Sequence, residues 1–104
     1  MRPYADAVSA VPVPFRQALR AELDALVAGE RPELLVWVDD YPATLVRQPD
    51  EIWTHPISQV VQRADGSAWA VLPLWTEAES PSDLSAEVEV DPSGSATSVD
   101  VHVL

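Results

Sequence analysis

Alternating hydrophobic and polar residues dominate the C-terminal third of the chain. Residues 84–91 place Leu84, Ala86, Val88 and Val90 on one side and Ser85, Glu87, Glu89 and Asp91 on the other. A period of two is typical of a strand with one solvated face. Residues 91–95 supply Pro and Gly for a turn, after which Thr97, Val99, Val101 and Val103 alternate with Ser98, Asp100 and His102. The pattern predicts a hairpin over 84–103.

The run before this hairpin is apolar on both sides. Ala70, Leu72 and Leu74 lie on one face of residues 68–76, and Trp69, Val71, Pro73 and Trp75 lie on the other. We therefore expect a third strand that has neighbours on both sides or a covered outer face. Pro73 cannot donate a ladder hydrogen bond, so we expect it at a bulge or an edge. Residues 56–63 precede a turn at 64–67 and predict a fourth strand.

Helical spacing appears in the N-terminal half. Residues 14–28 carry an apolar stripe that begins beside Pro14 and ends before Gly29, which predicts a helix. Residues 32–45 repeat the spacing through Leu34, Leu35, Val38, Tyr41 and Leu45 and favour a second helix, although 34–38 could instead form a strand. Ile52 and Trp53 are expected to lie under the sheet. Residues 1–12 lack periodicity and are expected to be loosely ordered.

These elements predict one α+β domain over residues 1–104. Two N-terminal helices would pack on one face of a four-stranded antiparallel sheet, in a layout analogous to that of cystatins. The other face would stay open, because the strands 84–91 and 97–103 have polar outer sides.

Charge narrows the class of partner. The 104 residues include 17 acidic residues and only six basic ones, all arginine, for a net charge of -11. This balance argues against nucleic acid and anionic membranes as partners and is compatible with a basic protein. The absence of lysine is typical of a GC-rich bacterial gene. No cysteine, membrane-length apolar run or signal-peptide core occurs, so we expect a cytoplasmic protein without disulfides.

Candidate chemistry is sparse. His55 and His102 are the two histidines, and neither lies in an HxH or HExxH motif, so we expect no metal site and no cofactor. His102 shares a strand face with Asp100, so the two could form a site together. A surface histidine beside an acidic residue is the more ordinary explanation of the same pattern. The acidic pairs Asp39/Asp40, Asp50/Glu51 and Glu77/Glu79 are better explained as solvated side chains than as acid–base catalysts. We therefore expect no enzymatic activity and no catalytic residue.

The sequence instead predicts a binding surface. If the valine faces of the hairpin meet the helices, the opposite face carries Trp69, Trp75, Glu87, Glu89, Asp100 and His102. Aromatic residues in a polar frame are typical of interaction hot spots. In that case Trp75→Ala should preserve the fold and abolish partner binding. The alternative places both tryptophans in the core.

Three segments resemble a known family. They are Leu74-Trp75-Thr76-Glu77, Ser82-Asp83-Leu84 and Asp100-Val101-His102-Val103-Leu104. The pattern is similar to that of a family of small uncharacterised bacterial proteins, and weaker similarity extends it over about residues 41–104. In the relatives an acidic pair and Tyr-Gly stand where this chain has 39–42, which favours a helix there. Ser80-Pro81 replaces the family's Gly-Arg, and Val99 replaces an aspartate. The resemblance implies no mechanism.

We therefore expect a non-enzymatic acidic module that binds a protein, such as an inhibitor or immunity-type protein for a basic partner. Two alternatives remain open. One is a small-ligand domain with a pocket between helices and sheet. The other is an accessory protein or homodimer whose sheet face is an oligomer interface.

Overall fold

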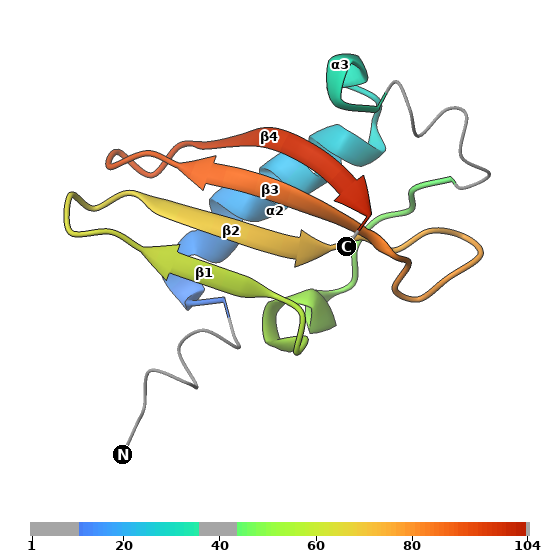
Figure 1. The fold of residues 1–104 in the computed structure, drawn as a ribbon, viewed down its shortest axis with the longest axis horizontal. Coiled ribbons are helices and arrows are strands. Elements are labelled where there is room, and N and C mark those ends of the chain that lie inside the picture. Colours follow the sequence, from blue (N-terminus) through green and yellow to red (C-terminus); the bar gives the residue numbers. More distant parts are fainter. Residues whose placement is uncertain (1–10, 36–43, 104) are drawn as a thin grey trace.

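A computed structural model describes residues 11–35 and 44–103. Its central feature is an antiparallel sheet of four strands, in the spatial order β1-β2-β3-β4. The strands are β1 (Gln59–Gln62), β2 (Ala68–Pro73), β3 (Leu84–Val90) and β4 (Ala96–Val103). Each strand pairs with its neighbour in sequence, so the sheet is a meander (Figure 1). The predicted α+β class, the four antiparallel strands and the C-terminal hairpin are confirmed.

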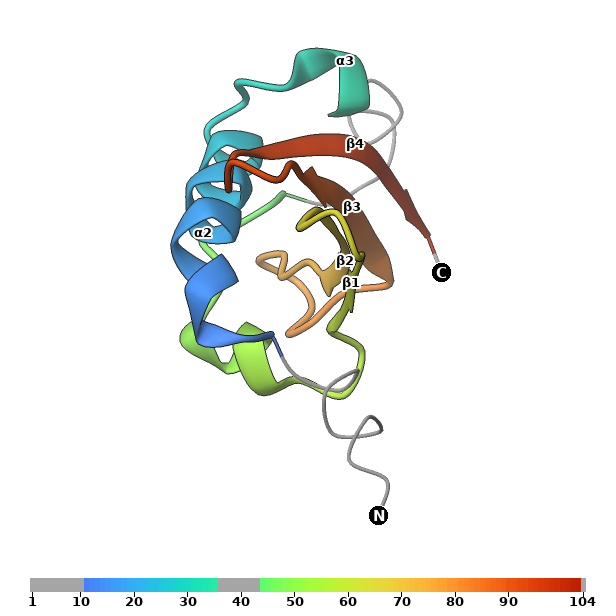
Figure 2. The same cartoon turned by 90° about the vertical axis from the view of Figure 1, so that its left-hand side faces the viewer.

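One long helix covers one face of this sheet. Helix α2 (Val13–Val27) begins after Pro12 and ends before Gly29, whose φ of 79° is the left-handed conformation that glycine adopts without strain. Figure 2 shows α2 against the sheet, with the 3₁₀ helix η1 (Asp50–Thr54) beneath it. Leu19, Leu23 and Leu26 pack into a continuous apolar cluster with the inner face of the strands.

Only the first turn of the second predicted helix lies within the described residues and is helical. Helix α3 (Pro32–Leu35) is a single turn, and residues 36–43 lie outside the described ranges. Leu45, which was assigned to that helix, instead forms an isolated antiparallel bridge with Thr76. The described ranges thus show one main helix and a single helical turn in place of the expected two helices, and they do not support a cystatin-like layout. Within those ranges, no helix has both the length and the apolarity that crossing a membrane requires.

The N-terminal lead also differs from expectation where it is described. Residues 1–10 lie outside the described ranges. Val11, however, is fully buried, and its N–H donates to Trp53 O at 2.8 Å. Ile52 and Trp53 are buried as predicted, so η1 closes the bottom of the core.

A β-bulge changes which side chains of β4 face inward. Glu87 pairs with Asp100, but the next residue, Val88, pairs with Ser98, so Val99 has no counterpart on β3. The extra residue shifts the alternation by one position. Val99 is therefore 46% exposed and Ser98 is buried, the reverse of the predicted faces, whereas Val101 is buried as predicted.

Glu22 of α2 meets β4 at this bulge. It is only 5% exposed, although glutamate is a residue type that is rarely buried. Its carboxylate accepts two hydrogen bonds from Arg31, at 2.8 and 3.0 Å, and one from Ser98 N at 2.9 Å. Burial raises the pKa of Glu22, but the hydrogen bonds from Arg31 and Ser98 lower it more, and the net pKa lies below its ordinary value of 4.5.

Candidate functional site

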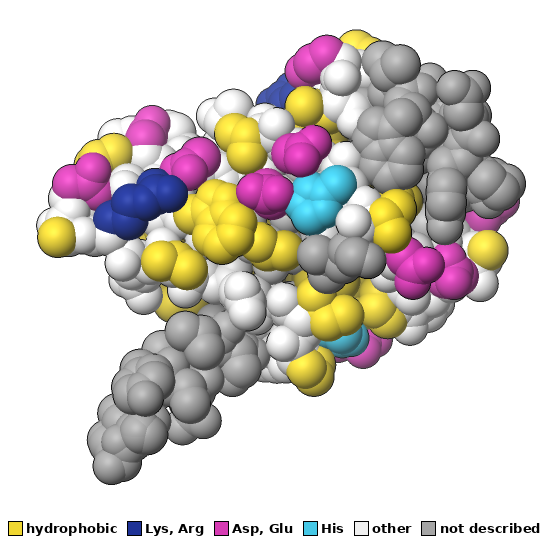
Figure 3. Space-filling model, in the orientation of Figure 1, with side chains coloured by type: hydrophobic (Ala, Val, Ile, Leu, Met, Phe, Trp, Pro, Cys, Tyr) yellow, Lys and Arg dark blue, Asp and Glu magenta, His cyan; other side chains and the backbone are white. Residues whose placement is uncertain are grey.

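The sheet face opposite α2 is open among the described residues. Figure 2 shows the described helices away from this face, and Figure 3 shows acidic side chains, a histidine and apolar surface gathered on it. Trp69 and Val71 of β2, Glu87 and Glu89 of β3, and Asp100 and His102 of β4 alternate with inward residues that are buried in the core. This open face is the candidate functional site.

Strand register brings its acidic and aromatic residues together. Glu87 pairs with Val71 on one side and with Asp100 on the other, which places it in the middle of the face. The half-buried indole of Trp69 donates from Nε1 to Glu87 Oε1 at 3.1 Å. Buried or half-buried indoles usually find such a partner. The hydrogen bond therefore fixes the orientation of both side chains.

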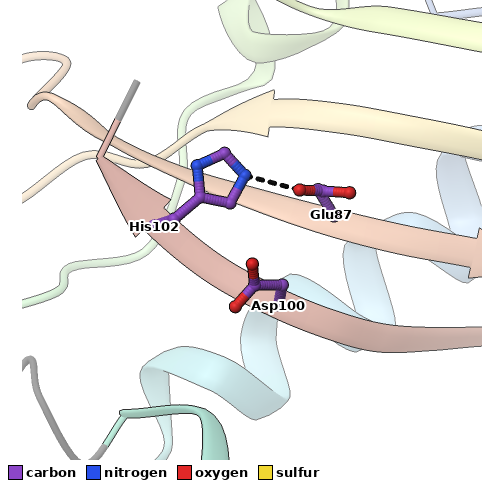
Figure 4. Close-up of side chains that lie close together, drawn as sticks. All are labelled: Glu87, Asp100 and His102. Carbon is purple, nitrogen blue, oxygen red and sulfur yellow. Dashed lines mark hydrogen bonds and ion pairs between the residues drawn. The ribbon is translucent and has the colours of Figure 1, made fainter.

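Glu87, Asp100 and His102 form a compact cluster. His102 Nε2 donates to Glu87 Oε2 at 2.6 Å (Figure 4). Each of the three side chains has one nitrogen or oxygen atom that could bind a metal ion, and these three atoms lie within 4.8 Å of one another. Asp100 is exposed, whereas Glu87 and His102 are half-buried. The cluster is therefore accessible to water on one side and supported by the sheet on the other.

Arg63 neutralises the other carboxylate on β3. Its guanidinium bonds both oxygens of Glu89, at 2.7 and 2.9 Å. The hydrogen bond to Arg63 lowers the pKa of Glu89, and the same bond raises the pKa of Arg63. Glu89 consequently has a built-in counter-ion, whereas Glu87 and Asp100 have no arginine among their described partners.

A hollow of about 380 Å³ opens beside the cluster. Apolar and polar side chains both line it: Pro56, Ile57, Gln59, Trp69, Val71, Glu87 and His102. Pockets for organic groups are commonly apolar with a few placed polar atoms. This hollow is large enough for one side chain of a partner, and a carboxylate and an imidazole lie at its margin.

Five of the six predicted face residues lie on this face: Trp69, Glu87, Glu89, Asp100 and His102. Trp75 does not, because β2 ends at Pro73 and the alternation stops there. Trp75 is 4% exposed and belongs to the core cluster, with His55 edge-on at 5.7 Å between ring centroids. The placement of Trp75 on the open face was therefore wrong, and we now expect Trp75→Ala to destabilise the fold.

Several residues around the site could not be identified from the sequence. Arg63 was assigned only to the end of a strand, and its pairing with Glu89 depends on the β1–β2–β3 register. The sequence pattern places Ser85 only on the polar side of its strand. It is 1% exposed, lies directly opposite His102, and its Oγ has no hydrogen-bond partner among the described residues.

Comparison with known proteins identifies a family and no function. A family model described as "Domain of unknown function (DUF7668)" matches residues 15–104. The matched residues run from α2 to the C-terminal end of the chain and include the segments that carry the resemblance described above. No curated protein and no solved structure matches the chain.

Proposed function

The chain belongs to the family DUF7668, a domain of unknown function, and we propose from the geometry that it is a non-enzymatic module whose open sheet face binds a protein with a basic surface. The observation that carries the proposal is the half-buried Trp69 held by Glu87 beside a hollow on an open face. Tryptophan is one of the side chains enriched at interaction hot spots, which lie inside a rim of weaker contacts.

Charge supports a basic partner. Asp100 and Glu87 lie next to the hollow without an arginine among their described partners, and the whole chain carries a net charge of -11. An arginine or lysine of a partner that enters the hollow would lie over the face of the Trp69 ring and beside the Glu87 carboxylate. It would gain a cation–π contact and a charge-assisted hydrogen bond there. An inhibitor or immunity-type protein in the cytoplasm fits this chemistry.

The arrangement of Ser85 supports a role without catalysis. Ser85 lies opposite His102, a pairing that resembles a nucleophile beside its base, but its Oγ is buried and no hydrogen bond joins the two among the described residues. A nucleophile must reach both its base and its substrate. The helix–sheet interface is filled by a continuous apolar cluster, which also weighs against a ligand pocket at that position.

The test compares partner capture by matched variants. The chain is immobilised and exposed to extract of its host as wild type, Trp69→Ala, Glu87→Gln/Asp100→Asn, and the control Glu30→Gln, which changes an exposed acid on the helix side. We expect a basic protein to be retained by wild type and control and lost from both face variants. Its affinity should fall steeply with salt. Equal capture by all four chains would refute this function, and a concentration-dependent mass lost in Trp69→Ala would indicate a homodimer instead.

A further inference from the structure

The cluster of Glu87, Asp100 and His102 has the composition of a metal site. We propose that these three side chains bind one divalent transition-metal ion of the Zn²⁺ class on the open face. This inference is independent of the proposed function, because it concerns the isolated chain. One donor atom from each residue lies within 4.8 Å of the other two. Glu87 and Asp100 are paired positions of β3 and β4, and His102 lies two residues further along β4 opposite Ser85, so the ladder holds all three backbones in place.

The donor set selects the class of ion. One imidazole nitrogen and two carboxylate oxygens suit Zn²⁺ and other first-row transition metals, which accept nitrogen ligands readily. Mg²⁺ and Ca²⁺ prefer oxygen-only shells and a larger number of ligands. Three protein ligands on a surface that is exposed at Asp100 would leave the remaining positions to water.

The distances require only small side-chain movements. Metal–ligand bonds of about 2.0–2.2 Å in a tetrahedral site separate donor atoms by roughly 3.3–3.6 Å. In the structure His102 Nε2 and Glu87 Oε2 lie 2.6 Å apart, and the ligand atoms of all three residues lie within 4.8 Å of one another. Binding would replace the proton between His102 and Glu87, since ligands bind metal in their deprotonated forms.

Two further groups suit the outer layer of such a site. Trp69 Nε1 donates a hydrogen bond to Glu87 Oε1, and the other carboxylate oxygen, Oε2, faces His102. Hydrogen bonds of this kind commonly orient metal-binding carboxylates. Ser85 shares this face, directly opposite His102, and its Oγ is buried without a partner among the described residues. A metal-bound water or carboxylate would supply the hydrogen bond that this hydroxyl lacks.

The experiment titrates the full chain with ZnCl₂ by isothermal calorimetry and repeats the titration with MgCl₂. The site variants are His102→Asn, Asp100→Asn and Glu87→Gln, and the control is Glu89→Gln, an acid on the same strand and face that is paired with Arg63. Circular dichroism verifies that every variant is folded. His102→Ala provides a second substitution at the nitrogen ligand.

We expect one Zn²⁺ per chain, much weaker Mg²⁺ binding, and a loss of Zn²⁺ affinity of about tenfold or more in each site variant, since even outer-layer changes cost about 10–100-fold. The control should bind as the wild type does. Absence of Zn²⁺ binding would overturn the inference. So would binding that both His102 variants leave unchanged, because the ion would then associate with acidic surface only.

Discussion

Replacing Glu22 by glutamine tests how α2 is attached to the edge of the sheet. The substitution keeps the shape of the side chain and removes its charge. In the native protein the carboxylate receives two hydrogen bonds from Arg31 and one from the backbone of Ser98, at the β4 bulge. Glutamine can still accept from Ser98, but its NH₂ group faces the guanidinium and cannot accept from it.

The expected cost follows from the burial of the two partners. Breaking a fully buried ion pair costs about 3–5 kcal/mol. The Glu22 side chain is 6% exposed, but that of Arg31 is 33% exposed and can be partly rehydrated. We therefore expect Glu22→Gln to lose about 2 kcal/mol, out of a total of about 5–15 kcal/mol for a small domain. The midpoint of thermal unfolding should fall by about 10 °C.

The pH dependence gives a second and independent measurement. The net pKa of folded Glu22 lies below its ordinary 4.5 because the hydrogen bonds outweigh burial. A carboxyl with a lowered folded pKa stabilises the protein above its unfolded pKa, and this stabilisation is lost as pH falls through the folded pKa. The stability gap between wild type and Glu22→Gln should accordingly be full at pH 7 and narrow below pH 4.5.

Urea denaturation followed by circular dichroism measures both effects. Glu33→Gln is the matched control, because Glu33 is exposed on α3 near Arg31. We expect the control to unfold close to the wild-type midpoint. A Glu22→Gln midpoint equal to that of the control, or a gap that widens in acid, would refute the assigned role of this carboxylate.

Three other predictions use the same denaturation assay. Trp75→Ala should lose about 3–5 kcal/mol because it empties a core position, whereas the half-buried Trp69→Ala should lose clearly less; equal losses would contradict the assignment of the two tryptophans. Gln48→Leu should cost about 1–3 kcal/mol, because the buried amide accepts from Trp75 N and donates to Val46 O, and an unchanged midpoint would argue against that contact. Arg63→Ala removes an exposed ion pair and should shift the midpoint little, with any shift disappearing in high salt.

The regular parts of the fold could be predicted because local pattern and tertiary environment agree in them. Residues 84–90 alternate strictly and bury the predicted side. The stripe of α2 and the position of Gly29 likewise specify one helix with a defined end. In such segments a single periodicity decides both the element and its buried face.

The corrections arise where the periodicity is interrupted. Val99 is one residue too many for the β3–β4 ladder, and only the pairing partner reveals it. Trp75 lies beyond the end of β2, where the isolated bridge from Leu45 to Thr76 determines the neighbours. The burial of Glu22 could not be predicted, because a sequence does not show that Arg31 and a strand amide will satisfy a buried carboxylate.

The sequence predicts which residues belong to the site but not how close together their side chains lie. Alternation alone placed Glu87, Asp100 and His102 on one side of their strands. The convergence of the three donors depends on Glu87 pairing with Asp100, which is fixed by the hairpin register. The metal site proposed above was therefore not expected from the sequence, where His102 and Asp100 were considered without Glu87.

The unmatched Val99 makes β4 tolerant of a change in length at one position. Deleting it would leave Ser98 beside Asp100, in step with Val88 and Glu87, so both halves of the strand would keep their present orientation. Deleting Val101 would instead turn either Asp100 or His102 toward the core. Homologous chains that are one residue shorter can thus lose that residue here and still present the same surface to a partner.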